Sequence, residues 1–208
     1  MARPALTVAI LAGGAALRLG GRDKGLEILG DRPLIEWVIA YCRRSIVGVP
    51  GSDAGREVDL LIVANRHLEA FARYARVRTD AEAGFRGPLA GVASALETAA
   101  AERVLTLPVD CPFPPADLAA RLEAAMHAGG AAAVVAHDGQ RRQPLFALYR
   151  RELAASAAEA AAAGQGVHAW QDAIGAAEVD FSDRHRQFHN LNTPEDFAAC
   201  ADALRSCE

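Results

Sequence analysis

The most informative segment of the chain is Leu11-Ala12-Gly13-Gly14-Ala15-Ala16-Leu17-Arg18-Leu19-Gly20-Gly21-Arg22-Asp23-Lys24. It follows the apolar run Ala5–Leu11, which predicts a buried first strand, and it places four glycines, two arginines and a lysine in one loop. Such a loop is costly without a ligand, because glycine loses the most backbone entropy on folding and neighbouring cations repel one another. Phosphate oxygens accept hydrogen bonds from glycine N–H groups and neutralise the cations. The stretch therefore predicts a nucleotide triphosphate site at the end of the first strand.

The spacing within this loop excludes two familiar phosphate-binding patterns. The P-loop pattern G-x-x-x-x-G-K-[ST] fails because Gly20 is followed by Gly21, and the dinucleotide fingerprint G-x-G-x-x-G is absent. What remains is L-A-G-G-x-x-x-R-x-G-G-x-D-K. A GTPase switch and a dinucleotide-dependent enzyme are both disfavoured on this ground.

Short apolar runs alternate with helical patterns along the rest of the chain, which predicts a doubly wound α/β fold with right-handed crossovers. Several runs are apolar throughout, as expected when helices cover both faces of a sheet. The Asp138-Gly139 pair predicts a hairpin, and so one antiparallel member in a mainly parallel, mixed sheet. The expected strands are Ala5–Leu11, Val58–Ala64, Val77–Thr79, Val104–Val109, Ala131–His137, Gln143–Tyr149, Glu178–Phe181 and a short piece near Phe188–Asn190. The expected helices are Leu34–Val47, His67–Ala75, Leu89–Ala101, Pro115–Ala128, Glu152–Ala163, Val167–Ile174 and Pro194–Ser206.

Ligands of open α/β sheets bind at the carboxyl ends of the strands, so the residues that leave each strand are informative. The first strand leads to Lys24, the third to Asp80 and the fourth to Asp110. Mg²⁺ prefers a few carboxylate oxygens together with water and substrate phosphates, which Asp110 could supply. By itself, an acid in a Pro-rich turn such as this one also fits a role in capping local amides.

Six further pieces follow the glycine loop in a recognisable order. The pieces are Ala64-Asn65-Arg66-His67, Asp80, Gly87-Pro88-Leu89-Ala90-Gly91, Pro108-Val109-Asp110-Cys111-Pro112, His137-Asp138-Gly139 and Asn190-Leu191-Asn192-Thr193-Pro194. With them the chain resembles the molybdopterin nucleotidyltransferases, the nucleotidyltransferases of molybdenum cofactor biosynthesis, and most of all their guanylyltransferase branch.

This resemblance implies a Rossmann-like nucleotidyltransferase fold and Mg²⁺-dependent transfer of GMP from GTP to molybdopterin. It implies catalytic roles for Lys24 and Arg18 as phosphate-holding cations and for Asp110 as the metal ligand. Asn190 and Asn192 are expected near the molybdopterin, and cofactor-delivery proteins and molybdoenzyme apoproteins are the implied partners. The expected nucleotide-binding residues are Leu11, Ala12, Gly13, Gly14, Lys24, Asn65, Asp80 and Asp110.

Two other functions stay open at this point. The sister cytidylyltransferases resemble L-A-A-G where this chain has Leu11-Ala12-Gly13-Gly14, and the missing Cβ at Gly13 leaves room for a purine. The alternative that is not an enzyme is a non-catalytic carrier of the cofactor. The presence of both Lys24 and Asp110 argues against a carrier. One departure from the family is Val63, where the family often has asparagine. Whether Asp80 contacts guanine or ribose is left open.

The length and composition of the chain limit its number of domains and its classes of partner. A chain of 208 residues with a net charge of -4 fits one domain over residues 1–208 and gives no reason to expect nucleic acid or an anionic membrane as a partner. Its four cysteines lack C-x-x-C spacing, so neither a zinc site nor a disulfide is expected. No signal segment precedes the first strand, and no apolar run approaches the roughly 20 residues that span a bilayer. A cytoplasmic location is the expectation.

Overall fold

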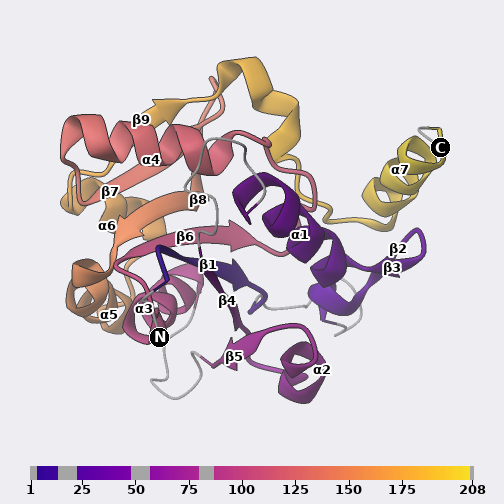
Figure 1. Ribbon diagram of the computed structural model, residues 1–208, viewed down its shortest axis with the longest axis horizontal. Helices are drawn as coiled ribbons and strands as arrows, with labels where there is room; N and C mark the ends of the chain where they lie inside the picture. Colours follow the sequence, from indigo (N-terminus) through magenta and orange to yellow (C-terminus); the bar gives the residue numbers. More distant parts are fainter. Residues whose placement is uncertain (1–3, 14–22, 48–56, 80–86, 207–208) are drawn as a thin grey trace.

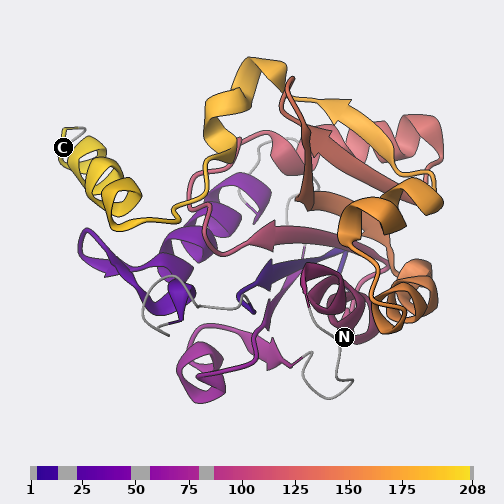
Figure 2. The same cartoon turned by 180° about the vertical axis from the view of Figure 1, so that it is seen from behind.

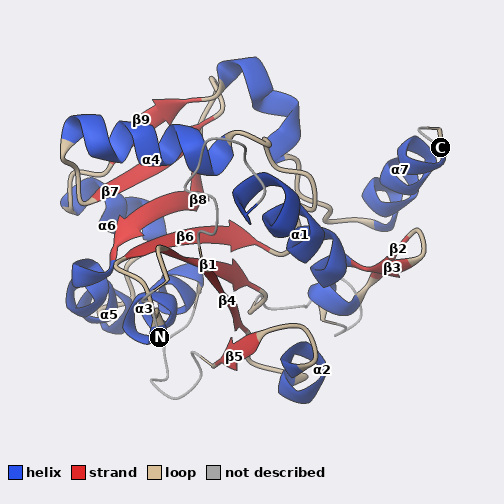
Figure 3. Cartoon of the chain, in the orientation of Figure 1, coloured by secondary structure: helices blue, strands red, loops and turns tan. Residues whose placement is uncertain are grey.

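A seven-stranded mixed sheet forms the centre of the protein (Figures 1 and 3). The computed structural model describes residues 4–13, 23–47, 57–79 and 87–206. The strands lie in the order β5-β4-β1-β6-β8-β7-β9, and β8 alone of these seven runs antiparallel to its neighbours. Their bounds are β1 Leu6–Leu11, β4 Val58–Val63, β5 Arg76–Arg78, β6 Arg103–Pro108, β7 Ala133–His137, β8 Arg142–Arg150 and β9 Ala177–Asp180.

Helices cover both faces of the sheet. Figure 1 shows α1 and α4 in front of it, and the reverse view in Figure 2 brings α3, α5 and α6 forward. Helix α7 and a small hairpin of strands β2 and β3 lie together at one side of the sheet (Figure 1). The bounds are β2 Ile28–Leu29, β3 Arg32–Pro33, α1 Leu34–Cys42, α2 Leu68–Ala72, α3 Pro88–Thr98, α4 Leu118–Gly129, α5 Ala154–Ala162, α6 Val167–Ala173 and α7 Pro194–Arg205.

The two helical layers explain why the strands are apolar throughout. Side chains alternate along a strand, so Leu6, Val8 and Ile10 of β1 enter the core beneath α1 and α4. Ala9 of the same strand enters the second core, beneath α3, α5 and α6. All four are fully buried. A sheet covered on both faces needs such continuous apolar strands, and the expected α/β fold is confirmed.

Most expected elements are present, with ends shifted by a few residues. The Asp138-Gly139 hairpin joins β7 to β8, as expected, with Gly139 at φ 91°. The strand expected near 188–190 is wrong, because Ser182–Phe188 forms a 3₁₀ helix that buries Phe188 against Phe146 and Phe181. The β2–β3 hairpin was not expected.

Strand order reverses on either side of β1. The chain passes from β1 to β4 and β5 on one side, and then returns to place β6 on the other. Both β4 and β6 run parallel to β1, so their carboxyl ends meet at one edge. A crevice forms at such a reversal, because the connections from the two strands leave in opposite directions. The residues that follow Leu11 and Pro108 therefore flank the expected binding edge.

Substituting Gly139 is expected to destabilise the fold. A Cβ on Gly139 would lie 2.7 Å from Cβ of Ser182, and its φ of 91° already disfavours other residues. We expect Gly139→Ala to lower the free energy of unfolding by about 1–3 kcal/mol in urea titrations. Gly164→Ala is the matched control, since Gly164 has φ 73° but no atom within 4 Å of an added Cβ. Equal losses in the two variants would contradict the contact argument.

Candidate active site

Three side chains from distant parts of the chain meet at the carboxyl edge of β1 and β6. The Lys24 ammonium donates to Oδ2 of Asp110 at 2.9 Å and to Oδ1 of Asn192 at 2.7 Å. The side chains of Lys24 and Asp110 are 24% and 19% exposed. This partial exposure leaves the cation and the carboxylate accessible to a ligand. Lys24 and Asp110, which were expected along one edge of the sheet, thus form an ion pair at that edge.

Lys24 begins a short 3₁₀ turn, Lys24–Leu26, that Asp23 caps. The Asp23 carboxylate accepts a hydrogen bond from the Gly25 amide at 3.2 Å. Burial raises the pKa of Asp23, while the Gly25 amide and the charges of His67 and Arg66 act in the opposite direction. Asp23 therefore shapes the turn that carries Lys24, and the ion-pair partner of Lys24 is Asp110.

Asp110 lies two residues past the end of β6. The Val109 amide donates to the Leu11 carbonyl at 3.1 Å, which continues the β1–β6 pairing up to the site. The Leu191 amide donates to the Asp110 carbonyl at 2.8 Å. The main chain of Asp110 is thereby held from both sides while its carboxylate faces Lys24.

Asn192 is held by the start of helix α7. Thr193 and Asp196 form a capping box, and Pro194 occupies the first helical turn. Asp196 Oδ2 also accepts from the Asn192 amide at 2.8 Å. The amides of Asn192 and Thr193 lower the pKa of Asp196, because they stabilise its charged form. The helix cap thus fixes the backbone from which the Asn192 side chain reaches Lys24.

The lowered pKa of Asp196 gives a pH prediction. A carboxyl with a depressed pKa stabilises the fold above its ordinary value of 3.8, and this contribution disappears as the pH falls through the folded-state pKa. We expect Asp196→Asn to lose less stability than the wild type between pH 7 and pH 3, as measured by urea unfolding. Glu195→Gln, at the neighbouring exposed acid, is the control and should follow the wild type. Identical pH profiles for the wild type and Asp196→Asn would contradict this role.

The expected nucleotide-binding residues that the structure describes lie along the same edge. Leu11 ends β1, the Ala12 amide donates to the Val63 carbonyl at 2.8 Å, and Gly13 is exposed just beyond. Asn65 follows β4 and accepts from the Thr79 hydroxyl at 3.2 Å. Gly14, Arg18 and Asp80 lie outside the described residues. Val63, at the position where the family often has asparagine, is buried in the core.

Asn190 is directed to a different place from Asn192. Its Oδ1 is buried and accepts no hydrogen bond within the described part of the chain. It lines a hollow of about 240 Å³ on the β8 side of β6. The other lining residues are Pro108, Arg141, Arg142, Gln143, Pro144, Leu145, Phe146 and His168. This hollow adjoins the edge on the side away from β1.

Cys111 follows Asp110 but is not suited to act as a nucleophile. Its side chain is buried, and Sγ donates to the Gln187 carbonyl at 3.3 Å. Burial raises the pKa of the thiol far above its ordinary value, so the reactive thiolate is suppressed. The chemistry at this edge therefore depends on charge and positioning.

The lysine content of the chain also points to Lys24. Lys24 is the only lysine, since the other 21 of the 22 lysine and arginine residues are arginines. An ammonium is a compact point charge, whereas guanidinium is a planar fork. A single lysine in an otherwise arginine-based chain singles out Lys24 without reference to the glycine pattern.

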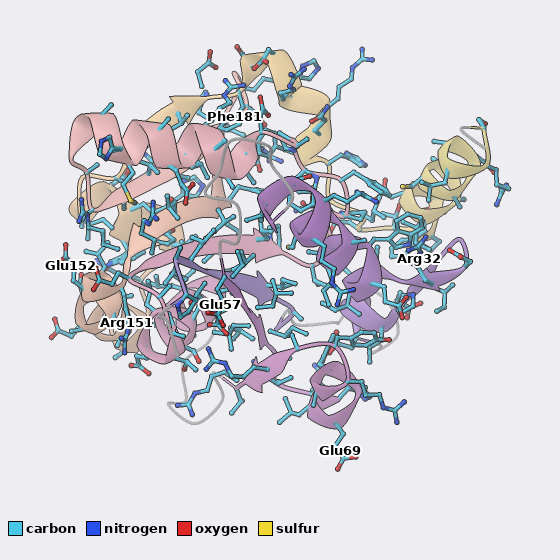
Figure 4. The ribbon with its side chains drawn as sticks, viewed as in Figure 1. Arg32, Glu57, Glu69, Arg151, Glu152 and Phe181 are labelled. Atoms are coloured by element: carbon cyan, nitrogen blue, oxygen red, sulfur yellow. The ribbon has the colours of Figure 1, made fainter. Side chains whose placement is uncertain are left out.

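A further hollow, of about 610 Å³, lies at the opposite edge of the sheet. Arg151 and Glu152 border it, and Figure 4 shows both far from Arg32, which lies on the β2–β3 hairpin near α7. Arg103 at the start of β6 pairs with Glu123 there at 3.4 Å. This hollow is a full strand length from Asp110, so it takes no part in the arrangement around Lys24.

A mainly parallel sheet with its charged residues gathered at the point of strand reversal is the architecture of a Rossmann-like nucleotidyltransferase. The chain belongs to the MobA-like NTP transferase family, whose domain matches residues 8–179. It is a nucleotidyltransferase of molybdenum cofactor biosynthesis. No helix within the described ranges is long and apolar enough to span a membrane.

Relatives match nearly the whole chain. A molybdenum cofactor guanylyltransferase from Shewanella amazonensis is 38% identical over 197 residues, covering 94% of this chain and 95% of its own. One from Mannheimia succiniciproducens is 37% identical over 193 residues, covering 92% and 96%.

Solved structures agree on the fold. Molybdopterin-guanine dinucleotide biosynthesis protein A from Archaeoglobus fulgidus matches with a TM-score of 0.76 at 21% identity, over 96% of this chain and 99% of its own. The 2-C-methyl-D-erythritol 4-phosphate cytidylyltransferase from Thermus thermophilus matches with a TM-score of 0.63 at 20% identity, over 98% and 100%.

Proposed function

We propose that the protein transfers GMP from GTP to molybdopterin, giving molybdopterin guanine dinucleotide and pyrophosphate. The observation that carries this proposal is the meeting of Lys24, Asp110 and Asn192 at the reversal point of the sheet. The names of the relatives support guanine as the base. The exposed Gly13, which lacks the Cβ of the cytidylyltransferase pattern, also supports a purine.

The chemistry requires no covalent protein intermediate. A phosphate oxygen of molybdopterin attacks the α-phosphorus of GTP, and a new P–O bond forms. The bond from that phosphorus to the bridging oxygen breaks, and pyrophosphate leaves with the electron pair. Negative charge grows on the leaving group and on the oxygens around phosphorus. Lys24 would stabilise that charge, and positioned cations at such a site supply most of the catalysis.

The donor set at this edge fits Mg²⁺. Mg²⁺ is usually bound by one or two carboxylates together with phosphate oxygens and water, and Asp110 provides one partly exposed carboxylate. In the described ranges no three metal-ligating side chains cluster, so the nucleotide would supply much of the coordination. When bound there, the ion would neutralise charge on the phosphates. Asp110 would hold it, and Lys24 would remain the fixed cation beside that carboxylate.

The nucleotide and the acceptor would approach from opposite sides of Asp110. We assign the nucleotide to the β1 and β4 side, with Leu11, Ala12, Gly13 and Asn65, and with the previously named Gly14, Arg18 and Asp80. The acceptor is assigned to the β8 side, near Asn192 and the hollow that Asn190 lines. The unsatisfied Asn190 Oδ1 could accept a hydrogen bond there. Delivery proteins and apoenzymes would exchange molybdopterin and product at this side.

The proposal is tested by pyrophosphate release with Mg²⁺ and molybdopterin, with GTP compared against CTP. Release that depends on both the acceptor and GTP is the expected result. Preference for CTP would overturn the purine assignment and leave the class of enzyme standing. Tight binding of the cofactor without release from either nucleotide would show a carrier.

A further inference from the structure

Gly25, immediately after Lys24, is packed too closely for a side chain. A Cβ built on Gly25 would lie 3.0 Å from both Cε1 and Cζ of Phe71 and 3.1 Å from Cγ2 of Val109. Its φ lies outside the left-handed region, so backbone conformation does not require glycine here. The requirement comes from two neighbouring side chains.

Neither neighbour is free to move away. Phe71, on helix α2, is fully buried in the core beneath α1 and α4. Val109 is 5% exposed, and its amide is bonded to the Leu11 carbonyl at 3.1 Å. Interiors are close-packed, so an added methyl group has to displace the residue that carries it or strain the surrounding core. The remaining partner in this contact is the short turn of Lys24–Leu26, which is outside the sheet.

Displacement of that turn would act directly on Lys24. The Gly25 amide is bonded to the Asp23 carboxylate at 3.2 Å, so a shift of Gly25 would also disturb the cap of the turn that carries Lys24. The Lys24 ammonium reaches two separate partners, Asp110 and Asn192, at 2.9 and 2.7 Å. Both contacts are short, and a shift of the backbone by a few tenths of an ångström would lengthen at least one of them.

We propose that the contact of Gly25 with Phe71 and Val109 is the seat that positions Lys24 for phosphoryl transfer. Gly25 and Phe71 are positioning residues in this proposal, acting through Lys24. Phe71 lies on the helix that follows Asn65, and so the seat links the nucleotide side of the site to the catalytic cation. This inference rests on the proposed function for its kinetic consequence but not for its geometry.

The test compares Gly25→Ala with a rescue variant and a matched control. We expect Gly25→Ala to lower kcat for pyrophosphate release by about 10-fold or more, with a smaller change in KM for GTP, because misplacement by about 1 Å costs on the order of 100-fold. Phe71→Leu removes the two ring atoms, Cε1 and Cζ, that crowd Gly25, so Gly25→Ala/Phe71→Leu should recover most of the lost kcat. Gly129→Ala, on helix α4, is the control, since an added Cβ there meets no atom within 4 Å.

A second readout does not depend on activity. Because Lys24 is the only lysine, an amine-acetylating reagent reports on it alone, with the α-amino group of the chain as internal reference. The wild type, Gly129→Ala and the double variant should react slowly at Lys24, and Gly25→Ala should react faster at a temperature well below the melting temperature of every variant.

The outcomes separate the seat from the function. If Gly25→Ala matches Gly129→Ala in both kcat and acetylation rate, the contact of Gly25 with Phe71 and Val109 does not position Lys24, and the proposal is wrong. A fall in kcat that Phe71→Leu does not rescue, with no change in acetylation, would also overturn it. If the wild type releases no pyrophosphate from either nucleotide, the proposed function fails, while the acetylation rates still decide the seat.

Discussion

Lys24→Met is expected to lower kcat for pyrophosphate release by about 100- to 1,000-fold, the range found when one preorganised charge-stabilising donor is lost. The ammonium is held by Asp110 and Asn192 at short distance, and the Lys24 side chain is 24% exposed, so the cation is already placed before substrate binds. Methionine keeps an unbranched side chain, one atom shorter than that of lysine, and removes its charge. Steady-state kinetics with GTP, Mg²⁺ and acceptor measure the effect, and KM for GTP should change less than kcat.

Two further variants control this experiment. Lys24→Arg retains the charge but replaces a point charge with a wider planar fork, so an intermediate kcat is expected. Arg32→Gln removes a cation from the β2–β3 hairpin, where Arg32 stacks on Trp37 at 4.1 Å from the ring centroid, and should leave kcat near the wild-type value. A loss below tenfold in Lys24→Met would show that Lys24 does not stabilise the transition state.

Asp110→Asn, as a separate single variant, is expected to lower kcat by about 100- to 1,000-fold, the same range as for the loss of one charge-stabilising group. The amide keeps the shape of the side chain, and the bond from the Leu191 amide to the Asp110 main-chain carbonyl is unaffected. The change therefore removes the carboxylate charge with little effect on the surrounding backbone. Because a neutral amide is a weaker ligand for a hard cation, the Mg²⁺ concentration for half-maximal rate should also rise.

The control for this second prediction is Asp31→Asn, in the exposed turn of the β2–β3 hairpin, which also removes one carboxylate. It should leave both kcat and the Mg²⁺ dependence unchanged. If Asp110→Asn lowers kcat but shifts no Mg²⁺ requirement, Asp110 acts on Lys24 and does not hold the metal.

The inner strands β1, β4, β6 and β7 of the main sheet were predictable because each is a mainly apolar run followed by turn residues. The separate two-stranded hairpin was not. Strands β2 and β3 have two residues each, too short for any periodicity, and only Gly30-Asp31 between them could have indicated a hairpin. Helix α2 was expected to start at His67 but begins at Leu68, because His67 adopts a left-handed conformation with φ 50°. Such limits are set by tertiary contacts, which the local pattern does not contain.

Site residues that lie next to a local sequence pattern were predictable, whereas contacts between distant positions were not. Lys24 follows the glycine loop and Asp110 follows an apolar strand, so both were expected at one edge. The contact between Lys24 and Asn192 joins positions 168 residues apart and depends on where α7 begins. Asn190 and Asn192 were expected in one place, near the molybdopterin, but the strand expected near 188–190 is absent, and Asn190 lines a separate hollow. The crowding of Gly25 by Phe71 is invisible in the sequence for the same reason.

The attachment of Leu191 and Asn192 to the residues around Asp110 also has a consequence for biosynthesis on the ribosome. Translation runs from the amino terminus, so Lys24 and Asp110 leave the ribosome well before the segment that holds them together. The bonds from Leu191 to Asp110 and from Lys24 to Asn192 can form only once that segment has emerged. A nascent chain that has folded its first four sheet strands therefore still lacks one wall of the site, and the contacts around Lys24 are complete only after residue 192 has emerged.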